Sequence, residues 1–177
     1  MSNDIGNMTE RISYRLANLA DMPAIHAIQE ESYPPSMQEK QEIILRRLQE
    51  APATCWIAED KEGACAYLFT YPSRLGAVTA LEGGFLVADD ADTLYLHDLA
   101  VLQRATGRGV GKALFNLAMK FARAQRMPYS ALVSVQDSYP YWSKLGYIPG
   151  TPSPEYGDCL KSYPEDAIYM VKSLNYS

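Results

Sequence analysis

The sequence predicts an α/β domain, and three observations support that fold class. Residues 96–101 form an apolar, strand-like run that leads through a glycine-rich turn into a helical pattern from Val110. Further strand and helix patterns follow each other on both sides of this unit. The 177 residues show no repeat and no linker, which fits one domain with its own core. We expect residues 1–10 to form a flexible tail and residues 11–177 to form a single domain.

The first half of the chain predicts a strand, two helices and a hairpin. Residues 12–17 alternate as in a strand, and Asp21 can cap a helix that follows. Ser36 and Glu39 have the spacing of a capping box, which predicts a second helix directly after them. Residues 54–72 form two apolar runs around a charged turn, which predicts the hairpin.

The second half predicts the central strand, turn and helix, followed by smaller elements. An irregular stretch over residues 73–93 precedes the central strand. After the long helix we expect a strand over 129–135, a short helix over 138–145, a proline-rich loop over 149–166 and a strand over 167–171.

The turn between the central strand and helix has the composition of a phosphate-binding loop. Gly107, Gly109 and Gly111 let the backbone approach an anion, and the amides at the helix start point towards it. The spacing excludes a P-loop, because Gly111 and Lys112 are followed by Ala113 and not by a hydroxyl residue. It also departs from the dinucleotide fingerprint, since the third glycine comes one residue early.

Three segments carry a resemblance to a known family. Residues 104–109, RATGRG, fit the pattern [QR]-x-x-G-x-[GA] and resemble the acetyl-CoA pyrophosphate loop of the GNAT N-acetyltransferase superfamily. Residues 139–147, YPYWSKLGY, resemble the FYxKxGF signature of that family. Residues 96–101, LHDLAV, are similar to the segment of arylalkylamine N-acetyltransferases that carries an HxH pair. His97 matches the second histidine of that pair, and Tyr95 replaces the first.

The resemblance implies a GNAT-type fold, with a mixed, mostly antiparallel central sheet and helices on both faces. Two strands, residues 95–101 and 129–135, would splay apart and hold acetyl-CoA, the acyl donor. Main-chain contacts to its pantetheine arm would come from Leu99, Ala100 and Val101. Contacts to its pyrophosphate would come from Arg104, Ala105, Thr106, Gly107, Arg108 and Gly109, with Val110, Gly111 and Lys112 adjoining.

Acetyl transfer to an amine requires a base for the amine, a donor for the oxyanion and an acid for the leaving thiolate. Histidine titrates near neutral pH, so His97, one of two histidines, is the candidate base. The tyrosine acid of the family falls on Trp142, which has no titratable proton. Tyr141, Tyr139 or water would therefore protonate the thiolate.

Four residues are candidate contacts for the acceptor amine: Tyr33, Tyr95, Asp98 and Tyr156. Tyr33 follows the first helix, where the family has a wall of its acceptor site, and Tyr156 lies in a loop expected to line the same cavity. Asp98 would orient His97 or meet the substrate ammonium. Regular strand geometry, however, places it on the face opposite His97.

Composition argues against several other classes. The chain has 16 basic and 21 acidic residues, a net charge of −5, with no basic block, which argues against a nucleic-acid surface. No apolar run approaches the roughly 18 residues of a membrane span, and the first ten residues lack the features of a secretory signal. The three cysteines have no metal-ligand spacing, so we expect reduced thiols, a cytoplasmic location and no metal.

The sequence therefore predicts an acyltransferase that moves the acetyl group of acetyl-CoA directly to a primary amine. A small amine, aromatic amines included, is the leading acceptor, and a homodimer is a further expectation. Two alternatives stay open: a protein or peptide amine as the acceptor, and a non-catalytic module that binds acyl-CoA. A closed aromatic pocket would favour the small amine, whereas an open acidic groove would favour a peptide.

Overall fold

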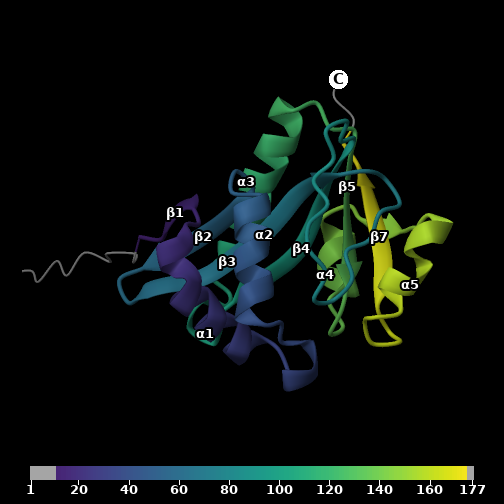
Figure 1. The fold of residues 1–177 in the computed structure, drawn as a ribbon. Coiled ribbons are helices and arrows are strands. Elements are labelled where there is room, and N and C mark those ends of the chain that lie inside the picture. Colours follow the sequence, from purple (N-terminus) through teal and green to yellow (C-terminus); the bar gives the residue numbers. More distant parts are fainter. Residues whose placement is uncertain (1–10, 175–177) are drawn as a thin grey trace, which may run out of the picture.

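The centre of the computed structural model, which describes residues 11–174, is a seven-stranded sheet in the order β1-β2-β3-β4-β5-β7-β6 (Figure 1). The strands are β1 (Ser13–Leu16), β2 (Cys55–Asp60), β3 (Gly63–Ser73), β4 (Thr93–Val101), β5 (Tyr129–Ser134), β6 (Ile148–Pro149) and β7 (Ile168–Ser173). Every neighbouring pair is antiparallel except β4 and β5, which are parallel. The predicted mixed, mostly antiparallel sheet is confirmed. The tail predicted at residues 1–10 lies outside the described residues.

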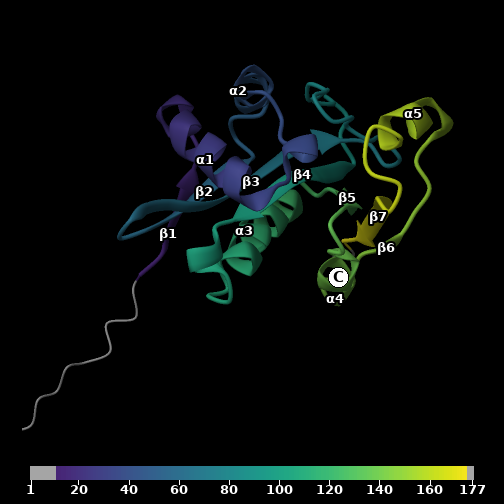
Figure 2. The same cartoon turned by 90° about the horizontal axis from the view of Figure 1, so that it is seen from below.

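Helices cover both faces of this sheet, as predicted. They are α1 (Met22–Ser32), α2 (Gln41–Glu50), α3 (Val110–Ala124), α4 (Tyr139–Lys144) and α5 (Gly157–Leu160). Figure 2 shows α1 and α2 on one face and α3 and α4 on the other. The short helix α5 lies in the stretch predicted to be a loop, and the two-residue strand β6 was not predicted.

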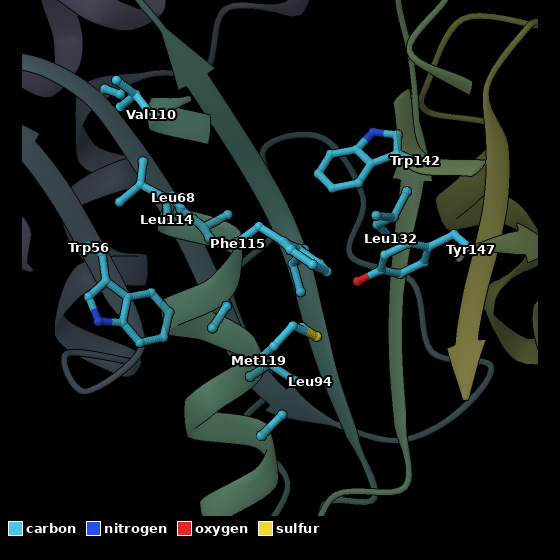
Figure 3. Packing of buried hydrophobic residues seen from close by; sticks show 14 of the residues in the cluster. Trp56, Leu68, Leu94, Val110, Leu114, Phe115, Met119, Leu132, Trp142 and Tyr147 are labelled. Atoms are coloured by element: carbon cyan, nitrogen blue, oxygen red, sulfur yellow. The ribbon is translucent and has the colours of Figure 1, made fainter. Parts of the chain in front are cut away.

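Each face of the sheet has its own hydrophobic core. On the α3 face, the apolar stripe of α3 packs mainly on β2, β3 and β4, because its buried positions recur every three or four residues. Figure 3 shows Phe115 and Met119 of this stripe pointing towards Leu132 and Tyr147. The Phe115 and Tyr147 rings meet edge to face at 6.2 Å. On the other face, α1 and α2 bury isoleucines and leucines against β2, β3 and β4.

The parallel strands β4 and β5 part halfway along their length. Their pairing begins at Thr93 with Tyr129 and ends at Leu96 with Leu132. Beyond that point, residues 98–101 of β4 pair only with β3, while the end of β5 pairs with β7. The predicted splay is therefore present, and it leaves backbone groups on the β5 side of β4 available to a ligand.

A β-bulge interrupts β4 at the splay. Phe69 of β3 pairs with Asp98, but the next residue, Thr70, pairs with Leu96, so His97 is an extra residue in β4. Such a bulge breaks the strict alternation of faces. The expectation that Asp98 lies on the face opposite His97 is wrong, because both side chains line the same cavity.

Two predicted helix caps are also wrong. Ser36 lies in a short 3-10 turn, and α2 begins only at Gln41, after an extended Lys40. Glu39 is buried and turns inward, away from a capping role. Asp21 makes no cap hydrogen bond to α1, because its carboxylate accepts two hydrogen bonds from the Arg15 guanidinium and one from the Asn18 amide.

Candidate functional site

A cavity of about 650 Å³ fills the opening between the splayed strands. This volume is typical of a pocket for a small molecule or cofactor. The predicted residues that line it are Tyr33, Leu99, Ala100, Val101, Ala105, Thr106, Gly107, Gly109, Val110, Gly111, Lys112 and Tyr141. The strand end, the glycine turn and the start of α3 thus surround one space.

The glycine turn presents main-chain amides at the start of α3. Gly107 and Gly109 have φ values of 79° and 75°, a left-handed conformation that favours glycine. No side chain caps the helix, and the first helical hydrogen bond runs from the Ala113 amide to the Gly109 carbonyl. The amides of residues 110–112 therefore have no partner within the helix, and they lie at the positive end of its dipole. Such a terminus is suited to a phosphate.

The two arginines of the turn point elsewhere. Arg104 and Arg108 both contact the Asp60 carboxylate at the end of β2, Arg108 at 3.2 Å. Arg104 also donates to the Ala64 carbonyl at 3.1 Å. Hydrogen bonding from Arg104 lowers the pKa of Asp60, so the carboxylate is ionised and holds both guanidinium groups. Neither arginine is among the residues that line the large cavity.

A second cavity, of about 30 Å³, adjoins the first across β4. It is lined by Tyr33, Met37, Glu39, Leu81, His97, Asp98, Val135 and Tyr163. Tyr33 and Val135 line both cavities, so the two spaces meet beside the bulge. The smaller one has room for a group the size of an ammonium ion, and its walls are aromatic and acidic.

Asp98 is held in the smaller cavity by two tyrosines. The Tyr33 and Tyr67 hydroxyls donate to its two carboxylate oxygens, each at 2.6 Å. Desolvation raises the pKa of Asp98 even though both hydrogen bonds favour the charged form. The same burial raises the pKa values of Tyr33 and Tyr67, so these hydroxyls stay protonated as donors. The two hydrogen bonds to Asp98 thus come from neutral hydroxyl groups, which leaves the carboxylate able to attract a cation in the cavity.

His97 belongs to a buried ionic cluster. Its Nε2 atom lies 3.0 Å from Oε1 of Glu39, and the Arg47 guanidinium binds both oxygens of that carboxylate at 2.5 and 2.6 Å. Burial raises the pKa of Glu39, but His97 and Arg47 outweigh it and lower that pKa overall. Sequence reasoning missed Glu39 and Arg47 as site residues, because the capping-box spacing of Glu39 indicated a local role.

The remaining predicted residues lie in different places. Tyr141 lines the large cavity, and its hydroxyl is close to Gly111, where an added methyl group would come within 3.3 Å of it. Tyr139 is exposed and lines neither cavity. Tyr95 is buried, with its ring beside those of Tyr71 and His97, and Tyr156 packs at the margin of the core under α1 and α2. Tyr95 and Tyr156 are not brought into either cavity.

Residues 11–174 show neither a metal-binding cluster nor a membrane-spanning helix. No cluster of three or more histidine, cysteine, aspartate or glutamate side chains that could hold a metal ion occurs there. In the same residues, no helix combines the length and the apolar character needed to cross a membrane.

Comparison with known proteins agrees with this architecture. A family model described as the acetyltransferase (GNAT) family matches residues 22–147. No curated protein matches the sequence.

Several solved structures share the fold. The loading GNATL domain of CurA from Lyngbya majuscula superposes with a TM-score of 0.75 at 13% identity, covering 92% of this chain and 98% of that one. A GphF GNAT-like decarboxylase in complex with isobutyryl-CoA has a TM-score of 0.74 at 17% identity, over 92% and 100% of the chains. The ribosomal-protein-S18-alanine N-acetyltransferase from Escherichia coli has a TM-score of 0.66 at 14% identity, over 94% and 96%. At these identities the likeness concerns the fold alone.

Proposed function

Because the chain belongs to the acetyltransferase (GNAT) family, we propose that it transfers the acetyl group of acetyl-CoA directly to a small primary amine. One observation supports this most strongly. A cavity with free helix-terminal amides and a cavity with a histidine and a carboxylate adjoin at the bulge of β4. A donor and an acceptor bound in these two spaces would meet beside His97, as direct transfer requires.

The larger cavity fits the acyl donor. Amides of residues 110–112 and the turn at Gly107 and Gly109 would hold the pyrophosphate. The backbone of Leu99–Val101, which has no β5 partner, would bond the amides of the pantetheine arm, although the Leu99 carbonyl also lies 3.2 Å from the Tyr33 hydroxyl. One of the same backbone N–H groups would stabilise the oxyanion that forms during transfer.

The smaller cavity fits the acceptor. Asp98 would receive the ammonium group, since its carboxylate accepts hydrogen bonds from two neutral tyrosine hydroxyls and lines the cavity. His97 would take the proton that the amine must lose before attack. Tyr141, in the larger cavity, would return a proton to the leaving thiolate. The pKa of Tyr141 is raised by burial, so its hydroxyl is protonated at neutral pH and can act as an acid.

The small volume and the aromatic walls of the acceptor cavity support a small amine as the first acceptor to test. Tyr33 and Tyr163 line this cavity, whose volume of about 30 Å³ is far smaller than the 650 Å³ of the donor cavity. The arylalkylamine branch stays a prediction that rests on residues 96–101. Arylalkylamines are therefore the first acceptors to test, followed by polyamines.

Isothermal titration with acetyl-CoA, with free CoA as the control, tests the donor site. We expect micromolar binding, followed by thiol release when an acceptor amine is added. Absence of binding at millimolar acetyl-CoA would refute the transferase function. Tight binding without turnover on the amine panel and on peptides would instead favour a non-catalytic acyl-CoA-binding module.

A further inference from the structure

The cluster beside the acceptor cavity contains three buried polar side chains that come from separate elements. Arg47 lies on α2, Glu39 precedes that helix, and His97 is the bulge residue of β4. Their side chains are only 1%, 5% and 2% exposed. Burying three ionisable groups is costly unless each has partners, so their arrangement calls for an explanation.

The hydrogen bonds define which ring nitrogen of His97 carries a proton. Glu39 receives a bidentate pair from Arg47, and its Oε2 atom also accepts the Glu82 amide at 2.7 Å. A carboxylate held ionised in this way can only accept. The contact at 3.0 Å therefore requires that His97 donate its Nε2 proton to Glu39. In the neutral ring, Nδ1 then carries the free electron pair.

Nδ1 is the unusual atom of the cluster. It is buried, and among residues 11–174 it has no hydrogen-bond partner. Buried side-chain nitrogens in native proteins are nearly always satisfied. The ring itself is held firmly, with Phe85 edge-on at 5.5 Å and Tyr95 stacked at 6.4 Å. Because His97 lines the acceptor cavity, a ligand there can supply the missing partner.

We infer that Glu39 is a positioning residue, which, held by Arg47, keeps His97 as the Nε2–H tautomer and so makes Nδ1 the atom that takes the acceptor's proton. This inference rests on the proposed function, since it gives an atomic role to the base of that reaction. In the step, the N–H bond of the ammonium breaks, its proton moves to Nδ1, and the nitrogen keeps its electron pair for the attack. Glu39 then faces the positive charge of the imidazolium.

The tautomer can be observed without any turnover. The chain has two histidines, so nitrogen-15 labelling of histidine gives two ring systems in long-range correlation spectra. A His26→Gln variant assigns the other one. At a pH where the ring is neutral, we expect His97 in the full-length wild-type protein to be protonated at Nε2 alone. A ring protonated at Nδ1 would overturn the inference, whatever the enzyme acetylates.

Glu39→Gln is the matching variant, because it keeps the size of the side chain and removes its charge. We expect both tautomers of His97 to appear, and kcat/KM for the amine to fall by roughly 10- to 100-fold with the Kd for CoA unchanged. The control is Glu59→Gln on β2. Glu59 is another carboxylate that pairs with an arginine, since it lies 2.7 Å from Arg15 of β1. The control should change neither the spectrum nor the rate.

The two arms separate failure of this inference from failure of the proposed function. A Glu39→Gln protein with wild-type kcat/KM and an unchanged His97 spectrum would refute the positioning role. If no amine is acetylated, yet the wild-type ring is protonated at Nε2 and Glu39→Gln mixes the tautomers, the positioning stands and the function assigned to the site fails. If Glu39→Gln does not fold, the wild-type spectrum still decides the tautomer.

Discussion

The donor side and the acceptor side of the candidate site are built from different materials. The donor side is mainly backbone from one continuous stretch, where β4 passes through the glycine turn into α3. The acceptor side is made of side chains from β4 and from the segments that connect the other elements, and its buried network of charges includes Arg47 of α2. A backbone site depends on local conformation, whereas a side-chain site depends on tertiary packing. Substitutions on the acceptor side should therefore change catalysis and stability, whereas those on the donor side should mainly change the Kd for acetyl-CoA.

The largest expected effect is on the chemistry of the acceptor side. His97→Asn should lower kcat/KM for the amine by about 10²- to 10⁴-fold, because it removes the base. The Kd for acetyl-CoA should not change, because His97 is not among the residues that line the donor cavity. Steady-state kinetics over a range of pH and a titration with acetyl-CoA measure the two quantities. Unchanged kcat/KM and an unchanged pH profile would remove His97 from the mechanism.

The next effect is on stability, again on the acceptor side. Arg47→Met leaves Glu39 buried without its bidentate partner, and we expect the free energy of unfolding to fall by about 3–5 kcal/mol. The matched control is Arg46→Met on the same helix, where an arginine 60% exposed pairs with Glu50. That change should cost at most about 1 kcal/mol. Denaturant unfolding compares them, and equal losses would contradict the role of the buried pair.

The same cluster predicts sensitivity to acid. The pKa of Glu39 is lowered in the folded protein, so below the ordinary value of 4.5 the unfolded chain binds more protons there than the folded chain. The contribution of Glu39 to stability is complete above that pH and is lost as the pH falls below it. The raised pKa of Asp98 has the opposite sign, which makes a direct comparison of variants necessary.

Urea unfolding from neutral pH to about pH 3 measures this dependence. Glu39→Gln should show a shallower loss of stability below the ordinary glutamate pKa than the wild type. Parallel curves for the two proteins would mean that Glu39 is not the titrating group.

On the donor side, a backbone substitution should reduce binding with a smaller loss of stability. Gly109→Val places a β-branched residue at a φ of 75°, which costs about 1–2 kcal/mol, although an added Cβ would meet no neighbour. We expect the Kd for acetyl-CoA to rise about tenfold, because the turn no longer presents its amides in the same geometry. Gly157→Ala, at an open position without positive φ, is the control. Unchanged binding by Gly109→Val would show that this conformation does not matter.

The smallest effect should come from the arginines beside the turn. Asp60→Asn removes the carboxylate that holds Arg104 and Arg108, so their charges become available to the phosphates of the donor. The two arginines remain partly exposed to solvent, at 30% and 28%, so we expect a modest gain, and the Kd for acetyl-CoA should fall by no more than about fivefold. The gain should shrink at high salt. Weaker binding would mean that Asp60 positions the arginines and does not compete for them.

The sequence by itself determined the donor side and the order of the main elements. Glycine spacing, the apolar stripe of α3 and the alternation of the strands are local signals, and β4, α3, β5 and α4 formed within a few residues of their predicted bounds. Even the splay at residues 97–101 followed from the resemblance carried by the glycine turn and residues 139–147. Roles on this side depend on backbone geometry, which a short stretch of sequence encodes.

Only the tertiary structure decided the acceptor side. The bulge at His97 arises from the register between β3 and β4, and it brings Asp98 onto the same cavity. Glu39 lies 58 residues from His97, and its contacts with His97 and Arg47 depend on the packing of α2 against the sheet. Tyr95, which looked like a substrate contact, became part of the core instead. A strand register and a contact between distant segments depend on how whole surfaces fit together, and local spacing in the sequence does not encode that fit.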